Sequence, residues 1–123
     1  MEGMRNVFRF LTPILLVLVV VSLAAAADIT GTLVDRHCAA NVVKEGQKAA
    51  QAHTRECALM PDCLKAGYAV YTADSKLFIL DAAGNKTAEA ALRASQKKND
   101  LKVQISGQVT GDNIKVATLK LLP

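Results

Sequence analysis

The most regular hydrophobic pattern lies near the end of the chain. Between residues 101 and 110, apolar residues alternate with polar ones, and Gly107 takes one apolar position. A period of two is typical of a strand with one buried face. After a turn at 111–113, the apolar residues of segment 114–121 change parity halfway along. The change of parity predicts a bulge near Ala117, because one extra residue moves the following side chains to the other face.

Three further strands are predicted upstream. Residues 28–35, 68–72 and 77–81 are rich in β-branched and aromatic residues, and residues 73–76 provide a hairpin connection between the last two. Gly31 inside the first strand predicts a bend or a close approach of another backbone. Residues 82–85 are interpreted as a turn, followed by a helix that Thr87 caps and that ends near Lys97-Lys98.

The segment between the first two strands, residues 36–66, has a different composition. It is rich in Ala, Lys and Gln and contains all three cysteines of the chain. Apolar residues and His53 recur at helical spacing from Val42 to Cys57, which predicts one amphipathic helix. Pro61 opens a second short helix, which runs to Lys65 and is closed by Gly67.

The element order is strand, helical insertion, two strands, helix and two strands. A mainly β domain with five strands and a helix between the third and fourth is the order of an OB-like barrel. The alternative is an open antiparallel sheet with one face covered by the helices.

The N-terminus has a pattern of its own. Arg5 and Arg9 precede an apolar run from Ile14 to Ala27 that ends in small residues. This pattern is typical of a secretory signal peptide over residues 1–27. A membrane anchor is the alternative, but the run is shorter than the roughly 20 residues that span a bilayer. We therefore expect a domain at 28–123, exported to the periplasm or the extracellular space, with no stable membrane anchor after cleavage.

Charge and size narrow the function further. The chain has 15 basic and 11 acidic residues, and its net charge of +4 is spread without a basic stripe. This distribution argues against a nucleic-acid partner. A domain this small buries a modest fraction of its surface, so a covalent or metal crosslink would stabilise it. Export makes a disulfide chemically feasible.

Several segments carry a resemblance. "GTLVD" leads to a cysteine, a Cys/His-containing insertion follows, and the hairpins "GYAVYTADSKLFIL" and "VQISGQVTGDNIKVATLKL" complete the chain. Together they resemble small exported bacterial proteins of the OB-like type that carry such an insertion. The resemblance implies the fold and export, but no activity and no site residue. Other exported OB-fold proteins are linked to envelope stress and to small-ligand binding.

The stretch "HTRECALMPDC" holds the densest chemistry. His53 and Cys57 are four residues apart, which places them on one helical face, and Cys63 and Cys38 lie nearby in sequence. The favoured interpretation is a disulfide between Cys38 and either Cys57 or Cys63, with one thiol left over. The protein would then be a non-enzymatic binding or structural module whose partner is a small ligand or an envelope protein.

Two other interpretations stay open. Cys38, His53, Cys57 and Cys63 form a donor set suited to zinc, or to monovalent copper. A thiol-based redox enzyme is the third, because His53 could activate Cys57. That interpretation lacks an acid to orient the histidine, since Asp35, Glu56 and Asp62 are interpreted as surface charges, and His37 as a loop residue.

Aromatic residues suggest one more site. Tyr68, Tyr71 and Phe78 lie on the second and third strands, where they could form a stacking surface for a ligand.

Overall fold

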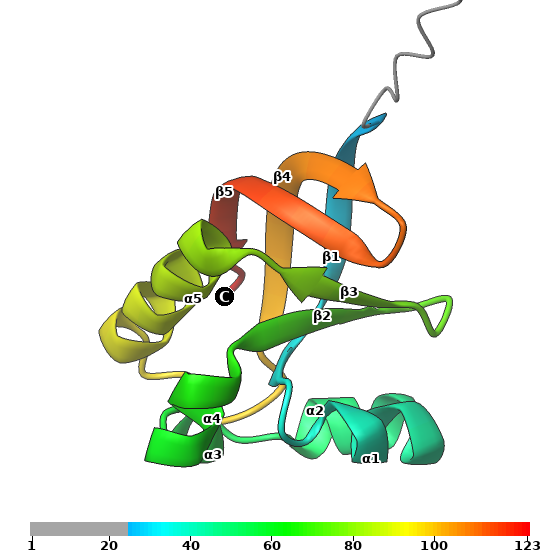
Figure 1. Ribbon diagram of the computed structural model, residues 1–123. Coiled ribbons are helices and arrows are strands. Elements are labelled where there is room, and N and C mark those ends of the chain that lie inside the picture. Colours follow the sequence, from blue (N-terminus) through cyan, green and yellow to red (C-terminus); the bar gives the residue numbers. More distant parts are fainter. Residues whose placement is uncertain (1–24) are drawn as a thin grey trace, which may run out of the picture.

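A computed structural model describes residues 25–123 and shows a five-stranded sheet that closes on itself (Figure 1). The strands are β1 (Ala25–Asp35), β2 (Tyr68–Thr72), β3 (Leu77–Leu80), β4 (Lys102–Thr110) and β5 (Asn113–Leu121). Their order around the ring is β1-β2-β3-β5-β4, and β4 pairs back onto β1. All pairs are antiparallel except β3 with β5. The expected mainly β architecture with five strands is therefore confirmed.

Within residues 25–123, five helices accompany the sheet. Four of them form the insertion between β1 and β2: α1 (Ala39–Glu45), α2 (Gln47–Ala52), α3 (Arg55–Ala58) and α4 (Pro61–Ala66). The fifth, α5 (Ala82–Ala94), connects β3 to β4 and packs mainly against β5. In Figure 1 the insertion gathers at one end of the ring, away from the β4–β5 turn.

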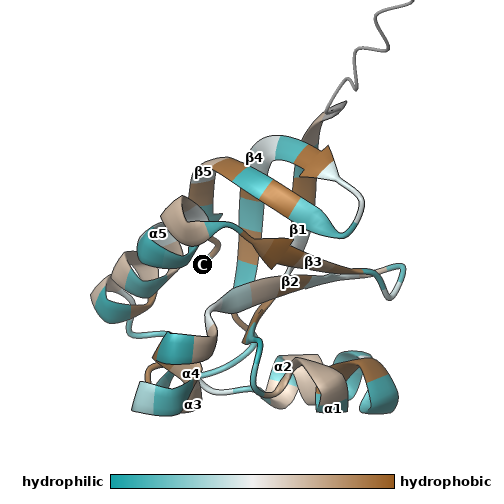
Figure 2. Ribbon diagram, viewed as in Figure 1, coloured by the Kyte–Doolittle hydropathy of each residue, from teal (hydrophilic) through white to brown (hydrophobic). Residues whose placement is uncertain are grey.

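The core consists of two clusters on opposite faces of β1 and β2. Inside the ring, Leu33, Val70 and Ile105 pack with Leu92 of α5. Outside it, Val34 packs under α1 and α2 in a second cluster. Figure 2 shows the alternation of polar and apolar residues along β4 and β5, whose outer faces carry polar side chains. The β1–β2 ribbon is thus buried on both sides, which holds the insertion in place.

The insertion differs from the expected pair of helices. The prediction of one helix from Val42 to Cys57 is wrong, because the chain breaks twice within it. Gly46 has a φ of 87°, a left-handed conformation that favours glycine and ends α1. His53 is extended, with φ −62° and ψ 128°, and ends α2. The helix opened by Pro61 and closed at Gly67 is confirmed as α4.

The helix after β3 begins earlier than expected. Residues 82–85 are the first turn of α5 rather than a separate turn, and the Asp81 side chain caps the helix by accepting the Gly84 N–H. Thr87 lies inside the helix, where its hydroxyl donates to the Ala83 carbonyl. The prediction missed an aspartate cap because Gly84 and Asn85 are typical turn residues.

Two backbone predictions are confirmed. The register between β4 and β5 shifts so that Ser106 pairs with Thr118 and Gly107 with Val116, which leaves Ala117 as the extra residue of a bulge. A Cβ atom on Gly31 would lie 2.6 Å from the Tyr71 carbonyl oxygen, so a neighbouring strand does approach closely there.

The predicted signal peptide lies almost entirely outside the described residues. Within residues 25–123, no helix is both long and apolar enough to cross a membrane.

Candidate metal centre at the end of the first strand

The site begins at Asp35, the last residue of β1. Its side chain is fully buried, at 0% exposure. Oδ1 accepts a hydrogen bond of 2.8 Å from the Cys38 backbone N–H, which fixes the carboxylate against the start of α1. The second oxygen, Oδ2, faces the insertion. The interpretation of Asp35 as a surface charge is therefore wrong, whereas Glu56 and Asp62 are exposed as expected.

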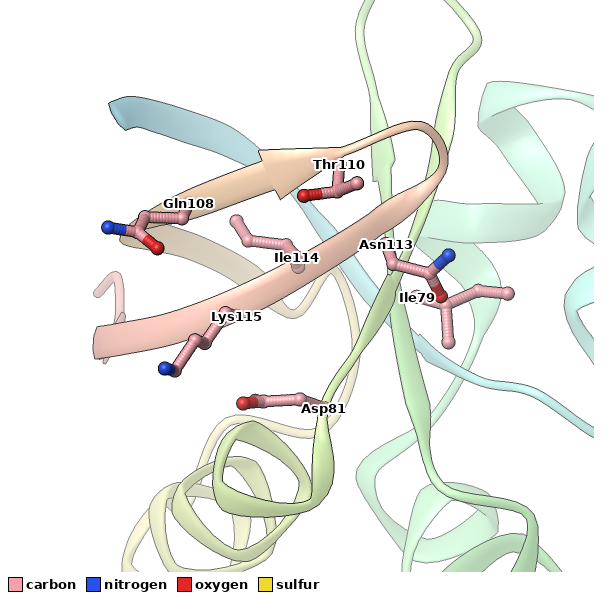
Figure 3. Close-up of a pocket in the computed structure, with 7 residues that line it drawn as sticks. All are labelled: Ile79, Asp81, Gln108, Thr110, Asn113, Ile114 and Lys115. Atoms are coloured by element: carbon pink, nitrogen blue, oxygen red, sulfur yellow. The ribbon is translucent and has the colours of Figure 1, made fainter. Parts of the chain in front are cut away.

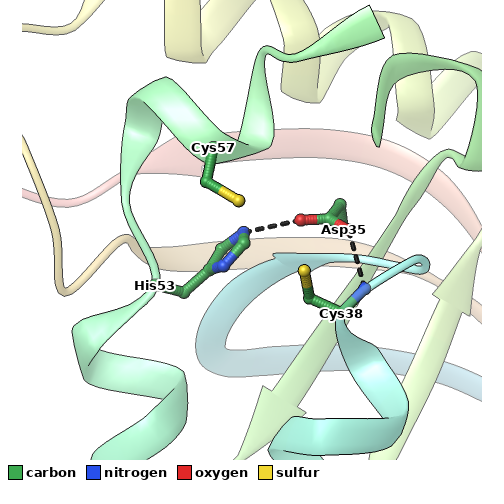
Figure 4. Close-up of side chains that lie close together, drawn as sticks. All are labelled: Asp35, Cys38, His53 and Cys57. Carbon is green, nitrogen blue, oxygen red and sulfur yellow. Dashed lines mark hydrogen bonds and ion pairs between the residues drawn. The ribbon is translucent and has the colours of Figure 1, made fainter. Parts of the chain in front are cut away.

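His53 meets this carboxylate from the end of α2. Its Nε2 lies 2.8 Å from Asp35 Oδ2, and its side chain is 6% exposed (Figure 4). The two groups form a buried ion-pair contact. Among the described residues, neither atom has a hydrogen-bond partner. Each atom therefore has the other as its polar contact and makes no further hydrogen bond to the described residues, which leaves both able to bind a cation placed beside them.

Two thiols complete the cluster. The sulfurs of Cys38 and Cys57, one ligand atom of Asp35 and one ring nitrogen of His53 all lie within 4.8 Å of one another. Both cysteines are half-buried, whereas the acid and the histidine are buried. Figure 4 shows the four side chains converging on one space from β1, the start of α1, the end of α2 and α3.

Local capping positions these side chains. Thr54 caps α3, and its Oγ1 accepts a 3.1 Å hydrogen bond from the Cys57 N–H. Arg55, between His53 and Cys57, donates from Nε to the Leu92 carbonyl at 2.6 Å and from Nη2 to the Arg93 carbonyl. Its backbone N–H also donates to the Lys98 carbonyl. The end of α5 therefore holds the segment that carries both His53 and Cys57.

Charge and burial shift the pKa values within the cluster. Burial alone would raise the pKa of Asp35, but its interactions with His53 and the Cys38 N–H lower it to about 2. Burial, the Asp35 charge and Cys57 raise the pKa of Cys38 to about 11. The carboxylate is thus ionised at neutral pH, whereas the metal-free Cys38 is a protonated thiol. A cation placed among these groups would favour the thiolate, because metal ligation displaces the proton.

The donor set fits a tetrahedral zinc ion. Zinc bonds of 2.0–2.3 Å place tetrahedral ligand atoms about 3.3–3.8 Å apart. The separations in the cluster extend up to 4.8 Å, and the 2.8 Å between His53 Nε2 and Asp35 Oδ2 is shorter than the tetrahedral range. Binding would therefore require side-chain movements in which these two atoms move apart slightly. Two sulfurs, one imidazole nitrogen and one carboxylate oxygen are all accepted zinc ligands. The hard carboxylate suits zinc better than monovalent copper, which prefers sulfur.

The same geometry is poorly arranged for a thiol enzyme. A catalytic histidine contacts its orienting acid with one ring nitrogen and its nucleophile with the other. Here Nε2 faces Asp35, and Figure 4 shows both sulfurs near that same edge of the ring. Asp35 is an acid that could orient His53, which the sequence analysis did not identify. However, it occupies the edge of the ring that the thiols also face.

The structure changes one member of the predicted metal set. Cys38, His53 and Cys57 come together as expected, but Asp35 takes the place expected for Cys63. Cys63 is 3% exposed and lies close to Asp35, and burial and the Asp35 charge raise its pKa to about 12. All three cysteines are free thiols, so the predicted disulfide is not formed in this structure. His37 is exposed, as predicted for a loop histidine.

The three aromatic residues do not share an exposed face. Tyr68 is 1% exposed, and its hydroxyl donates to the Ala58 carbonyl at 2.7 Å inside the main core. Tyr71 is 2% exposed and belongs to the cluster under α1 and α2, and Phe78 is half-buried. The expected stacking surface is corrected accordingly, because two of the three rings have no face open to a ligand.

A separate hollow of about 300 Å³ lies between β3, β4 and β5 (Figure 3). Its only carboxylate among the lining residues, Asp81, accepts hydrogen bonds from the Gly84 and Val116 N–H groups. Its charge is therefore committed to capping α5. The lining residues of the hollow include no cysteine and no histidine, so it lacks the donors that converge around His53.

Comparison with known proteins does not point to another site. The chain matches no protein-family model, no curated protein and no solved structure. The candidate metal centre therefore rests on its geometry alone: four convergent donors, two of them buried and without a hydrogen-bond partner.

Proposed function

We propose that this protein is an exported OB-like domain that binds one zinc ion through Asp35, Cys38, His53 and Cys57. The observation that carries the proposal is the buried contact between His53 Nε2 and Asp35 Oδ2, which converges with two thiols and makes no further hydrogen bond to the described residues. A metal ion would satisfy both atoms at once. It would also link the end of β1 to α1, α2 and α3. Such a link would stabilise the insertion, because a small domain has a small hydrophobic core to hold it by packing.

Support for the OB-like assignment comes from topology. The strand order β1-β2-β3-β5-β4, the return of β4 to β1 and the helix between the third and fourth strands follow the OB arrangement. The helical insertion lies where the β1–β2 connection would otherwise be a short loop. Fold alone does not define function, so the proposal depends on the site rather than on the topology.

Support for export comes from the N-terminal pattern of charge, apolar run and small residues. Cleavage before Asp28 would remove Ala25–Ala27, which pair with Gly107–Val109 at the far end of β1. The metal centre lies at the opposite end of that strand, so cleavage would leave it intact.

N-terminal sequencing of protein from the bacterial envelope tests export and should find a start near residue 27 or 28. Membrane-bound protein that retains Met1 would contradict export.

The zinc proposal is tested by titrating the reduced, metal-free protein with zinc in competition with a chelating dye. We expect one equivalent to bind. Asp35→Asn and His53→Ala should each weaken binding at least as much as the roughly 10–100-fold loss typical of outer-shell changes. His37→Ala is the matched control, because this exposed histidine lies one residue from Cys38. Absence of saturable binding, or equal losses in the control, would refute the proposal.

A further inference from the structure

The three cysteines differ in access to solvent and in their neighbours. Cys38 and Cys57 are half-buried, with sulfurs no more than 4.8 Å apart. Cys63 is buried and lies outside that four-residue group. Because thiol oxidation depends on access and on a nearby partner sulfur, the pair Cys38 and Cys57 is the one an external oxidant would reach. The sequence alone left Cys38 with two candidate partners.

The local structure permits the two sulfurs to approach. A disulfide needs a sulfur separation of about 2.05 Å, which requires movement of the side chains or their short helices. Cys38 precedes the seven-residue helix α1, and Cys57 lies in the four-residue helix α3. Neither residue is in the sheet, so a small shift of either segment leaves the paired strands in place. The bond would close a loop that contains α1 and α2.

We propose that Cys38 and Cys57 form a disulfide by exchange with a disulfide oxidant, and that this bond and the zinc ion are mutually exclusive; the mutual exclusion rests on the proposed zinc function. One thiolate attacks a sulfur of an oxidised dithiol protein or of glutathione disulfide, which gives a mixed disulfide. The second thiolate displaces the oxidant's remaining sulfur. The oxidant accepts two electrons and leaves as two thiols, after taking up two protons.

Zinc and the disulfide compete for the same two sulfurs. When zinc is bound, the reaction consumes one oxidant disulfide and two protons and releases one zinc ion. The oxidised protein keeps only Asp35 and His53 as donors, which is too few for a closed tetrahedral site. An exported protein would thus hold zinc in a reducing setting and release it in an oxidising one. Cys63 keeps its thiol in both states.

The test incubates the full chain with glutathione disulfide, with and without one equivalent of zinc, and then blocks the remaining thiols. Cyanogen bromide cleavage at Met60 leaves Cys38 and Cys57 in one fragment and puts Cys63 in another. Mass spectrometry therefore finds a Cys38–Cys57 bond as an internal loop of the first fragment, whereas a bond to Cys63 links the two fragments. We expect a Cys38–Cys57 link, with Cys63 blocked only after denaturation. Zinc should slow the reaction at least tenfold, and completed oxidation should release one equivalent of zinc to a dye.

Variants separate the two proposals. Cys63→Ser should still form the disulfide, whereas Cys38→Ser should leave Cys57 as a mixed disulfide with glutathione. A link to Cys63, or no link at all, would overturn the pairing even if zinc binds. Formation of the Cys38–Cys57 link in a protein that never binds zinc would uphold the pairing and refute the zinc function. Zinc retained by the oxidised protein would overturn the mutual exclusion alone.

Discussion

His53 Nε2 lies 2.8 Å from Asp35 Oδ2, and this contact joins the end of α2 to the end of β1. His53 belongs to the insertion and Asp35 to the sheet, and both side chains are buried. Removing one member leaves the other without its ion-pair contact in a buried position. Such a contact makes the orientation of the insertion sensitive to a single side chain.

The first prediction concerns this pair in the metal-free protein. Asp35→Ala removes the acceptor of the Cys38 N–H and the neighbour of His53, so it should lower the free energy of unfolding by about 3–5 kcal/mol. Asp35→Asn keeps an acceptor and should cost about 1–3 kcal/mol. Denaturant unfolding in the presence of a chelator measures both. Asp62→Ala, at an exposed position, should change stability by less than about 0.5 kcal/mol, and an equal loss there would contradict the assignment.

The second prediction concerns the inward face of β4. Ile105 is 0% exposed inside the ring, whereas the adjacent Gln104 is exposed. Ile105→Asp should unfold the domain, because an unpaired buried carboxylate costs several kcal/mol against a total stability of about 5–15 kcal/mol. Gln104→Asp should be nearly neutral. Circular dichroism measures whether each variant is folded. If both variants fold, or both unfold, residue 105 does not face the core alone and the assigned buried face of β4 is wrong.

The strands were predictable because their patterns are local. Alternation marks the buried face of β4, and the parity change in β5 locates the bulge at Ala117. The breaks in the insertion were not predictable from spacing, because helical periodicity continues across Gly46 and His53. Gly46 ends α1 through its local left-handed backbone. The break at His53 is accompanied by tertiary hydrogen bonds, because the backbones of Gln51 and Arg55 pair with Asp100 and Lys98 in the segment before β4.

The site was predictable in part, because three of its four residues lie within one short segment of the sequence. The clustering of His53, Cys57 and Cys38 in one insertion is visible in the sequence. Asp35 was missed, although it shares the parity of Ile29 and Leu33, which lie inside the ring. That parity predicts burial, and a buried carboxylate next to a Cys/His cluster is a ligand candidate. The choice between Asp35 and Cys63 depends on how α3 and α4 are turned, which only the folded chain determines.

The third prediction concerns Arg55, which fastens the insertion to the end of α5. Arg55→Lys keeps the charge but loses the forked donors to the Leu92 and Arg93 carbonyls. We expect a loss of about 1–3 kcal/mol in unfolding free energy and weaker zinc binding, because Arg55 lies between two ligands. Arg93→Lys, at a more exposed position, is the control. Hydrogen exchange should show faster opening of α3 in the Arg55 variant only, and unchanged exchange would argue against the anchoring role.

The fourth prediction is a pH dependence. Burial raises the pKa of Tyr68 to about 12, above its ordinary value near 10. Above pH 10 the unfolded tyrosine loses its proton first, so the contribution of Tyr68 is complete below that pH and is lost as pH rises toward 12. The loss amounts to roughly 2–3 kcal/mol. Tyr68→Phe lacks this titration, so the stability gap between the two proteins should shrink across that range. A constant gap would count against a buried, protonated Tyr68.

The last prediction distinguishes the two possible donor sets. The sequence offers Cys63 as a fourth ligand, whereas the structure places Asp35 in the cluster and Cys63 outside it, close to Asp35. Cys63→Ser should therefore keep one equivalent of zinc with affinity within about tenfold of the parent, the lower end of outer-shell effects. Cys38→Ser and Cys57→Ser should each lose more zinc affinity, because each removes a sulfur ligand.

Cobalt in place of zinc gives an independent measure, since the intensity of its sulfur-to-metal absorption band rises with the number of thiolate ligands. With Asp35 as ligand, that band is unchanged in Cys63→Ser and reduced in the other two variants. Equal reduction in all three would show that the helices turn to bring in the third sulfur, and Asp35 would then be a partner of His53 rather than a ligand.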